Sequence, residues 1–597
     1  MMTRLFGLLI FCALLSACSL SPYRVEQVNR VVETSRQTSL SCMLDVPDRC
    51  SDGSALIDLS EQDMRNGKHH LTLLEVGEDA LLIRVHLIRA ARETIELQNF
   101  IFRNDDSGEL LLNELLTAAR RGVKVRLLLD QLFSGNDLDY LVKLTLAHAN
   151  FEIKFYNPSF NKAKMSKRDW ISAVACCFRR FNQRMHNKLL VVDGLVGLMG
   201  GRNIADRYFD FDTNYDFKDR DVAVFGNTVI GMQHSFEPFW TSPKSVPVQH
   251  LRDVAKQLLA GTPEDLPPYT PPARFDALLN GVENQVLIRS KFIDPAFEVE
   301  RLEYFSDLPR KLSHPEESQA QDITRQLVGV LNSAQQSVVI QSPYMVLSGT
   351  VRKVFRDLRV DNPQIELIFS TNSLASTDAD TVYANTHKHK VRYVKRLGFY
   401  MYELKPFPVD APEFFPRWSL LMQEKEQGIS SKSNVSGDDS TIPIPAPRVG
   451  LHSKSFVVDG KIAMIGSHNF DPRSEGFNTE NGIIVWDEAF AQKLENLIRR
   501  DIEPQNSWVV AMKASKEVQE SLEADEHVRQ KAKYDTRFYG ATSLYELIPG
   551  REPVPPDSPN FYRNYFSVGS FPEVVKTRRQ INILFLGSFF GFLEPIL

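Results

Sequence analysis

Two short motifs with identical spacing carry the residues best suited to catalysis in this chain. Each has a histidine, a lysine two residues later, an aspartate seven residues later and an asparagine seventeen residues later. The first set is His186, Lys188, Asp193 and Asn203, and the second set is His452, Lys454, Asp459 and Asn469. One chance match to the His–Lys–Asp pattern is an event of roughly a few per cent at this composition. A lone histidine beside an apolar strand is more often a core residue, but the duplication favours catalysis.

Together these side chains offer two imidazoles, two ammonium groups and two carboxamides, a set that suits a tetrahedral phosphate anion. One histidine could attack phosphorus, while the other protonates the leaving alcohol and then takes a proton from the incoming alcohol or water. This chemistry requires no metal ion and no cofactor. Asp193 and Asp459 complete the candidate set, although their position in a turn suits them to holding the local backbone more than to touching substrate. Ser467, opposite Gly201 in the other motif, could add a hydroxyl to a phosphate site in one half alone.

A nucleophilic histidine needs a carboxylate on its second ring nitrogen to fix the tautomer. Glu480 follows His452 by 28 residues and is well placed to be that partner. Alignment of the two halves sets Asp219 opposite Glu480, and Asp221 is its competitor. The sequence thus predicts one carboxylate for each histidine, supplied within the same half.

The helices and strands that must position these residues also occur in two similar repeats. Residues 84–130 and 323–372 each alternate helix, strand, helix, strand, which predicts βαβ units and a mainly parallel sheet covered by helices. Each histidine and its lysine would share one face of a strand, and a turn after it would return the asparagine to the same site. We therefore expect an α/β protein of two pseudo-twofold-related lobes that share one active site.

Length and composition agree with several folded domains and exclude some classes of function. The chain has 597 residues, 43% apolar and 24% charged, and a net charge of −5. This charge argues against a globally basic nucleic-acid binder. The expected division is residues 1–17 a lipoprotein signal peptide, 18–80 an N-terminal extension, 81–260 the first lobe, 261–320 a linker, 321–500 the second lobe and 501–597 a C-terminal extension. An insertion at 406–449 is rich in polar residues and proline and predicts a mobile loop or lid.

The N-terminus has the pattern of an exported bacterial lipoprotein. An apolar run follows Arg4, and Leu15-Ser16-Ala17-Cys18 matches the lipoprotein cleavage site, with an ordinary secretory signal as the alternative. We expect lipidation of Cys18, anchorage to a membrane of the cell envelope facing the periplasm, and, from Ser19, the outer membrane in preference to the inner one.

Three further features are open at this stage. The pairs Cys42 with Cys50 and Cys176 with Cys177 are expected to be structural or free thiols rather than metal ligands. His387 and His389 predict a solvated helix face, with contact to lipid headgroups as the alternative. The apolar segment 581–597 either packs on the body or contacts a membrane surface, and is too interrupted to span one.

At these motifs the sequence resembles the phospholipase D superfamily, and most closely its bacterial cardiolipin synthases of the cardiolipin synthase C type. The resemblance spans about 80 to 490 and rests on the stretches around His186, Asn203, Thr371, Tyr402 and Asn469. It implies a two-lobed fold and metal-free transfer of a phosphatidyl group to a phosphatidylglycerol or glycerol-type acceptor. It also implies His186 as the nucleophile and His452 as the acid/base, with the lysines and asparagines around the phosphate.

Other functions use the same residues. A phospholipase D hydrolase differs in admitting water, and a nuclease of the same superfamily is disfavoured by the net charge and the expected anchor. A non-catalytic binding protein is disfavoured by the intact His, Lys and Asn of both halves. The expected partners are phospholipid substrates and a bacterial membrane, without nucleic acid, and the sequence does not identify a protein partner.

Overall fold

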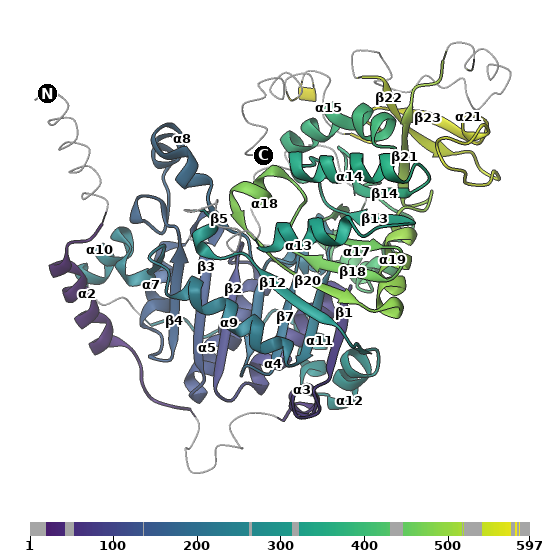
Figure 1. The fold of residues 1–597 in the computed structure, drawn as a ribbon. Helices are drawn as coiled ribbons and strands as arrows, with labels where there is room; N and C mark the ends of the chain where they lie inside the picture. Colours follow the sequence, from purple (N-terminus) through teal and green to yellow (C-terminus); the bar gives the residue numbers. More distant parts are fainter. Residues whose placement is uncertain are drawn as a thin grey trace, which may run out of the picture.

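The computed structural model describes residues 19–41, 53–134, 137–261, 265–312, 322–429, 446–515, 518, 540–574, 580–581 and 584 (Figure 1). Cys18, Cys42, Cys50 and almost all of segment 581–597 lie outside these residues, as do residues 430–445 of the insertion. Among the described residues, no helix combines the length and the apolar character needed to cross a membrane.

The chain builds two lobes, each around one large sheet. The first sheet has the order β10-β4-β3-β2-β6-β7-β9-β1-β11, and the second β12-β20-β18-β17-β13-β14-β15-β21-β22-β23. The strands of the first are β1 (His69–Leu74), β2 (Thr94–Asn99), β3 (Lys124–Asp130), β4 (Phe151–Tyr156), β6 (Leu189–Val192), β7 (Val196–Gly200), β9 (Asp221–Gly226), β10 (Ser245–Pro247) and β11 (Phe297–Glu298). The strands of the second are β12 (Leu302–Ser306), β13 (Ser337–Gln341), β14 (Glu366–Asn372), β15 (Tyr400–Leu404), β17 (Ser455–Val458), β18 (Ile462–Gly466), β20 (Asn481–Trp486), β21 (Ser507–Met512), β22 (Thr542–Leu547) and β23 (Tyr565–Gly569).

The α/β class and the two lobes agree with the sequence prediction, but the sheets are mixed rather than mainly parallel. The parallel part of each is the three-strand block β2-β3-β4 or β13-β14-β15. The other pairings within these two sheets are antiparallel, for example β6 with β2 and with β7. The reason is that only the repeated helix–strand segment crosses over; the motif strands that follow it join the sheet as hairpins.

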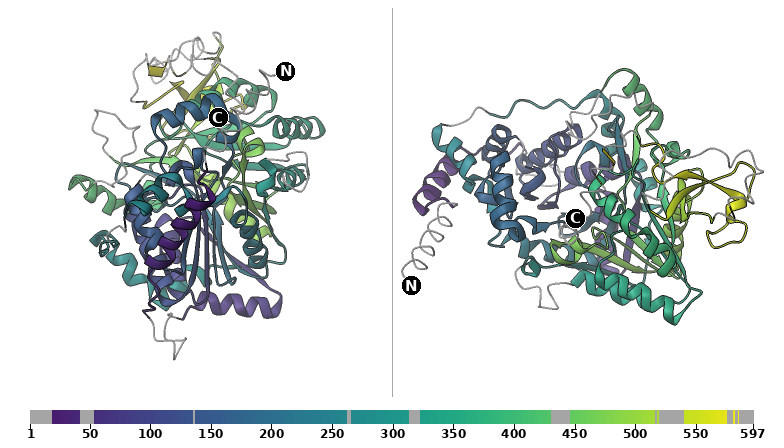
Figure 2. Two further views of the ribbon diagram at one scale, coloured as in Figure 1. Left: turned by 90° about the vertical axis from the view of Figure 1, so that its left-hand side faces the viewer. Right: turned by 90° about the horizontal axis from the view of Figure 1, so that it is seen from above.

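Each sheet is covered by helices on its outer face, and the two inner faces share one core (Figures 1 and 2). Outer helices of the first lobe are α4 (Gly77–Ala90), α5 (Asp106–Arg121) and α7 (Leu138–Leu146). Those of the second are α13 (Asp322–Leu331), α14 (Gly349–Asp361) and α15 (Asp380–Arg396). Between the sheets lie α9 (Thr228–Trp240) and α19 (Glu488–Asp501), whose apolar side chains form one buried cluster with residues of both sheets. The lobes are thus fused by a continuous core rather than linked loosely.

Both sheets extend beyond the boundaries expected from sequence. Strand β1 comes from the expected N-terminal extension, β11 and β12 from the expected linker, and β21–β23 from the expected C-terminal extension. The described part of the insertion is also structured. It contains α16 (Ala411–Phe414) and α17 (Trp418–Glu426), and Lys425 donates a hydrogen bond to the carbonyl of Thr213 at 3.0 Å.

One further expectation, on α15, is corrected, and the Cys176–Cys177 pair has the structural role that was expected of it. His389 and Lys390 of α15 are buried, and the ammonium group of Lys390 lies 2.6 Å from Glu403, so this helix face is not solvated. Cys176 and Cys177 form a disulfide with each other within α8 (Lys167–Asn182).

Candidate active site

His186 stands at a contact between the lobes. It follows β5 (Arg184–Met185), which pairs in parallel with β19 (Asn478–Thr479) of the second lobe. The backbone amide of His186 donates to the carbonyl of Thr479 at 2.9 Å, and its ring Nδ1 lies 2.7 Å from Oε2 of Glu480. Because an ionised carboxylate can only accept, Nδ1 carries the proton and Nε2 keeps its lone pair. The ring of Phe100 packs edge-on against the imidazole, with centroids 4.8 Å apart.

His452 is held in the same way from the opposite side. It follows β16 (Arg448–Leu451), which pairs in parallel with β8 (Tyr215–Lys218) of the first lobe. Its amide donates to the carbonyl of Lys218 at 2.9 Å, and its Nδ1 lies 2.5 Å from Oδ2 of Asp219. The aromatic rings of Tyr208 and Phe217 pack against this imidazole, at 5.1 and 5.0 Å.

The carboxylates therefore cross between the lobes, which corrects the pairing predicted from sequence. Glu480 of the second lobe holds His186 of the first, and Asp219 of the first lobe holds His452 of the second. The competitor Asp221 is excluded, since its carboxylate pairs with Arg84 at 2.7 Å and accepts the backbone amide of Arg202. Neither histidine has its orienting carboxylate without the other lobe.

The two carboxylates are supported differently. The hydroxyl of Ser467 donates to Oε2 of Glu480 at 2.5 Å, so Ser467 orients that carboxylate and is not free to bind phosphate as expected. The equivalent position in the first lobe is Gly201. A Cβ there would lie 2.1 Å from Oδ1 of Asp219. Glycine at 201 therefore makes the room that Asp219 occupies.

The lysines and asparagines lie in the same region. Lys188 donates from Nζ to the carbonyl of His186 at 2.7 Å, and Nζ of Lys454 lies 3.0 Å from Nδ1 of His452. Asn203 connects the surroundings of both histidines. Its side-chain oxygen accepts a hydrogen bond from the amide of Ile101, next to Phe100, and its amide group donates to the hydroxyl of Tyr208 at 2.9 Å. The side-chain oxygen of Asn469 is buried and makes no hydrogen bond to the residues described.

Burial and neighbouring charges set the protonation of the site. Burial lowers the pKa of His186 to about 3, against the opposing charge of Glu480, so its imidazole is neutral near pH 7. Burial and Lys454 lower the pKa of His452, which Asp219 and Asp378 oppose. Burial lowers the pKa of Lys188 to about 7 and that of Lys454 to about 8. Burial raises the pKa of Glu480, but the charge and hydrogen bond of His186 outweigh it and bring it to about 2. A bound phosphate would restore the lysine charges by compensating them.

Asp193 and Asp459 are placed away from the histidines, at the far ends of β6 and β17. Asp193 accepts the backbone amides of residues 92, 93 and 94, and Asp459 accepts those of residues 335, 336 and 337, each at 2.7–2.9 Å. Both adopt a left-handed φ of 52°. They fasten each motif hairpin to the start of the neighbouring parallel strand and do not face the imidazoles.

Three aromatic residues at the site were not singled out from sequence: Phe100, Tyr208 and Phe217. Phe100 directly follows β2, and the ends of strands are where sites form in α/β folds, so its position offered a signal. Asp378 ends the stretch around Thr371 that supports the family resemblance, but the sequence assigned it no role. It is exposed, accepts from the hydroxyl of Tyr344 at 3.0 Å, and its charge acts on both His452 and Lys454.

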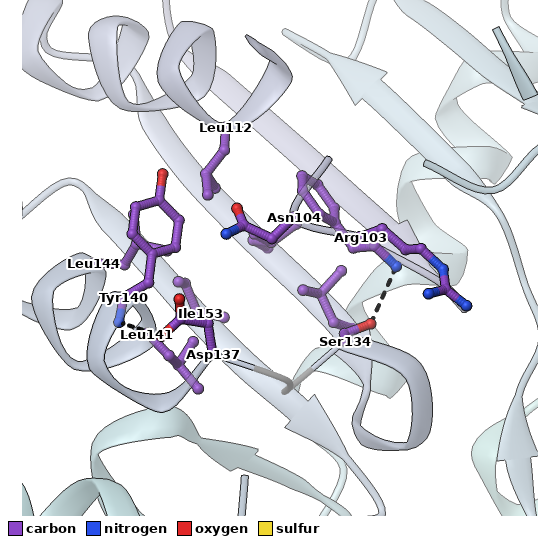
Figure 3. A pocket seen from close by; sticks show the side chains of 12 residues that line it. Arg103, Asn104, Leu112, Ser134, Asp137, Tyr140, Leu141, Leu144 and Ile153 are labelled. Atoms are coloured by element: carbon purple, nitrogen blue, oxygen red, sulfur yellow. Dashed lines mark hydrogen bonds between the residues drawn. The ribbon is translucent and has the colours of Figure 1, made fainter. Parts of the chain in front are cut away.

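A separate pocket lies on the outer side of the first sheet. It has a volume of about 190 Å³ and is lined mainly by apolar residues of β3, β4 and α7, with Arg103 and Asn104 beside them (Figure 3). None of the predicted site residues lines it. Within the described part of the chain, no group of three or more His, Cys, Asp or Glu side chains is arranged to hold a metal ion.

A family model and several known proteins match most of both lobes. A family model described as "Cardiolipin synthase, PLD-like domain" matches residues 85–234 and 327–502, more than half of the chain. The chain is 33% identical to a protein of Helicobacter pylori strain J99, over 79% of this chain and 87% of that protein. It is 32% identical to cardiolipin synthase C of Escherichia coli strain K12, over 74% of this chain and 86% of that protein. A solved structure of phosphatidylserine synthase from Haemophilus influenzae Rd KW20 aligns over 76% of this chain and 91% of that chain, with 12% identity and a TM-score of 0.48.

Two fused α/β lobes with duplicated His-Lys-Asn motifs define an enzyme of the phospholipase D superfamily, in its phosphatidyltransferase and phosphodiesterase class. Within that superfamily, the chain belongs to the cardiolipin synthase family with PLD-like domains. The family resemblance stated from sequence is confirmed.

Proposed function

We propose that this enzyme transfers a phosphatidyl group to the hydroxyl of phosphatidylglycerol or of a glycerol-type acceptor, through a covalent phosphohistidine. Phospholipids are the substrates that its family and its relative named cardiolipin synthase C support. The paired imidazoles, each with a carboxylate on Nδ1, support a two-step exchange at phosphorus.

In the first step, Nε2 of His186 attacks phosphorus while the bond from phosphorus to the leaving alcohol breaks. The protonated ring of His452 gives its Nε2 proton to that alcohol. In the second step, neutral His452 takes the proton of the acceptor hydroxyl, the acceptor oxygen bonds to phosphorus, and the bond from phosphorus to His186 breaks. The lysine ammonium groups and the asparagine amides stabilise the charge on the phosphate oxygens.

One observation carries the division of roles: the charges that face the two rings differ. Burial lowers the pKa of both rings; beyond it, Glu480 raises the pKa of His186 while Lys188 and Lys454 lower it. For His452, Lys454 lowers the pKa, whereas Asp219 and Asp378 both raise it. Since cations disfavour and carboxylates favour an imidazolium, His186 suits a neutral nucleophile and His452 suits the group that carries a proton.

A product profile tests the reaction. Purified full-length enzyme is given phosphatidylglycerol with labelled acyl chains, alone and paired with a second defined phospholipid, with His186→Ala as the inactive control. We expect a labelled lipid with two phosphates and release of the donor's headgroup alcohol. Phosphatidic acid as the sole labelled product would reject transfer in favour of hydrolysis, and cleavage of plasmid DNA would point to a nuclease.

Trapping the intermediate tests the roles of the histidines. With substrate labelled at phosphorus, His452→Ala should form or retain an acid-labile label on the protein at His186, while His186→Ala should carry none. Each substitution should lower turnover at least a hundredfold, the usual scale for a lost acid/base or nucleophile. A label found on His452 would reverse the assignment.

We also propose that the mature chain is lipidated on Cys18 and anchored in the cell envelope facing the periplasm. The support is the apolar run and the Leu15-Ser16-Ala17-Cys18 pattern. Incorporation of labelled palmitate, lost in Cys18→Ser, is the expected result. Labelling that persists in this variant would contradict the anchor, and membrane fractionation tests the preference for the outer membrane.

A further inference from the structure

Helix α8 (Lys167–Asn182) stands out from the first lobe immediately before the catalytic strand. The buried residues among its sixteen are Ala173, Phe181 and Asn182. Figure 1 shows the helix beyond the ends of β3 and β4, on the same side of the molecule as β5. It ends two residues before Arg184, the first residue of β5, and His186 follows β5 directly. A helix so little buried needs another reason to be apolar on one side.

One side of α8 presents large apolar side chains to solvent. Ile171 is 71% exposed, Val174 is 50% exposed and Trp170 is 39% exposed. Their spacing places them on one helix face, and Trp170 packs edge-on against Phe181 at 5.1 Å. Clusters of exposed apolar residues mark surfaces that meet a partner or a membrane.

Basic residues lie at both ends of this helix. Lys167, Arg168, Arg179 and Arg180 are exposed on the helix. The acid of its first turn, Asp169, is already engaged in the N-terminal capping box and pairs with Lys162 at 2.9 Å. Apolar residues with tryptophan, flanked by lysine and arginine, are typical of helices that lie in a membrane interface.

A cleft of about 430 Å³ opens beside α8 and carries the same charge. Arg180 and Lys244 line it together with Cys177 and Phe181, and its lining, within the described residues, includes no carboxylate. Burial and the charge of Arg180 lower the pKa of Lys244 to about 8. An anion bound between these two cations would offset their repulsion. Ser19, which directly follows the proposed lipidated Cys18, lines this cleft as well.

We propose that α8 and this cleft dock the enzyme on a bilayer containing anionic phospholipid, with Trp170, Ile171 and Val174 among the acyl chains and the basic residues at the level of the phosphates. The inference rests on the proposed function in taking phospholipid as the substrate. A second copy of the chain is the less suitable occupant, since it would bring two basic surfaces together. Docking here holds β5 and His186 at the depth of the lipid headgroups, where the phosphodiester lies.

Fluorescence of Trp170 tests the docking without turnover. The full-length His186→Ala variant is mixed with vesicles of phosphatidylglycerol or of phosphatidylcholine, each with brominated acyl chains that quench tryptophan on contact. The difference from the same variant carrying Trp170→Phe isolates the signal of Trp170. We expect Trp170 to be quenched in phosphatidylglycerol vesicles and the quenching to be lost in Ile171→Asp/Val174→Asp. Val360→Asp, at a residue of α14 that is 72% exposed, is the matched control and should leave the quenching unchanged.

The charge contribution is measured on the same signal. Arg179→Gln/Arg180→Gln should raise the phosphatidylglycerol content needed for half-maximal quenching, since each basic residue near an anionic surface changes partitioning roughly fivefold. Absence of Trp170 quenching in phosphatidylglycerol vesicles would overturn the proposal. So would quenching that survives Ile171→Asp/Val174→Asp, or a dimer in detergent that this double variant dissociates while Trp170 stays unquenched.

Turnover separates this inference from the proposed function. In the active enzyme, Ile171→Asp/Val174→Asp should lower turnover of long-chain phosphatidylglycerol in vesicles at least tenfold. It should leave turnover of dihexanoyl phosphatidylglycerol, below its micelle concentration, unchanged. An equal loss on both substrates would contradict a docking role. An enzyme without activity on either lipid, whose Trp170 is still quenched, would reject the proposed chemistry and retain the docking surface.

Discussion

The carboxylates that orient the two imidazoles occupy unequal spaces, and this inequality is decided by one side chain in each lobe. Ser467 reaches Glu480 with its hydroxyl, whereas Gly201 leaves the volume into which Asp219 extends. Asp219 in turn makes the 2.5 Å contact with His452. The orientation of His452 thus depends on the absence of a methyl group at residue 201.

Gly201→Ala adds only one methyl group but should strongly impair catalysis. The new Cβ would lie 2.1 Å from Oδ1 of Asp219, so the carboxylate must leave its position and release His452. We expect turnover to fall by about a hundredfold, as for loss of an oriented acid/base group. Gly231→Ala in α9 is the matched control, since nothing lies within 4 Å of a Cβ there. Steady-state rates measure turnover, and circular dichroism shows whether the variant folds. Near-normal turnover of folded Gly201→Ala would show that catalysis does not depend on this position of the Asp219 carboxylate.

The lysines predict the alkaline limit of activity. Burial lowers the pKa of Lys188 to about 7 and that of Lys454 to about 8. Each ammonium is charged below its pKa, so phosphate binding is strong at lower pH and weakens as pH rises through 7 to 8. We expect kcat/KM, which reports the free enzyme, to fall over this range on a short-chain phospholipid. In Lys188→Arg the charge persists, so any remaining activity should extend to higher pH. A flat profile between pH 6 and 9 would contradict a binding role for these ammonium groups.

At the scale of elements, each motif strand is fastened at both ends. One end pairs with a short strand of the other lobe, and the other end turns at Asp193-Gly194 or Asp459-Gly460 with left-handed φ angles. The aspartate carboxylate then accepts hydrogen bonds from three consecutive backbone amides at the start of the neighbouring parallel strand. The aspartate that recurs in both motifs is therefore explained by backbone fastening rather than by chemistry.

Asp459→Ala should lower stability while sparing the site. Three amides lose a charged acceptor, and alanine is strained at a φ of 52°, so we expect a loss of about 2–3 kcal/mol. Asp139→Ala on α7, whose side chain is 70% exposed and pairs with Lys143, is the control and should change stability by less than about 0.5 kcal/mol. Thermal unfolding gives the difference. Turnover per folded molecule should stay near normal, and a selective loss of turnover would assign Asp459 to the reaction.

Sequence patterns predicted these elements well where the signal is local. The strands and helices of both repeats lie close to their expected positions, because hydrophobic periodicity and strand length are written in neighbouring residues. The mixed sheet was not predicted, since a hairpin strand and a crossover strand have the same composition. Likewise, β1, β12 and β21–β23 join the sheets from segments that carry no motif.

On the scale of the whole molecule, the lobes are joined by buried polar contacts as well as by their common core. Arg220 of the first lobe is fully buried and pairs with Glu75, while donating to Gln341 at 2.8 Å and to Ser455 at 2.9 Å in the second. Arg220 directly follows Asp219 in the connection between β8 and β9, so this network fixes the segment that carries Asp219. Removal of one partner from such a network is costly, because it leaves a buried charge without compensation.

The crossing of the carboxylates is the part of the site that sequence reasoning could not reach. Spacing within one half predicts Glu480 as the carboxylate partner of His452, since the two are 28 residues apart. The actual partners of His186 and His452 are set by the pairing of β5 with β19 and of β8 with β16, each two to four residues long. Such short contacts between distant segments leave no periodic pattern in the chain.

The crossed arrangement makes a prediction that an arrangement within each lobe would reverse. Glu480→Gln removes the carboxylate from His186, so it should slow formation of the phosphohistidine and leave little label on the protein. Asp219→Asn removes the carboxylate from His452, so it should resemble His452→Ala and retain label on His186 while transfer to the acceptor slows. Rapid-quench measurement of protein-bound phosphorus label distinguishes the two.

If each carboxylate instead served the histidine of its own lobe, Asp219→Asn would be the variant without label and Glu480→Gln the one that retains it. Double variants that combine Asp219→Asn with a histidine substitution should show whether Asp219 acts through the histidine of the other lobe. Combining Asp219→Asn with His452→Ala should add little to either change alone, because both act on one unit. Combining Asp219→Asn with His186→Ala should leave the low label level of His186→Ala, since the nucleophile that would carry the phosphatidyl group is then missing. A double variant that loses activity additively in the first case would show that Asp219 does not act through His452.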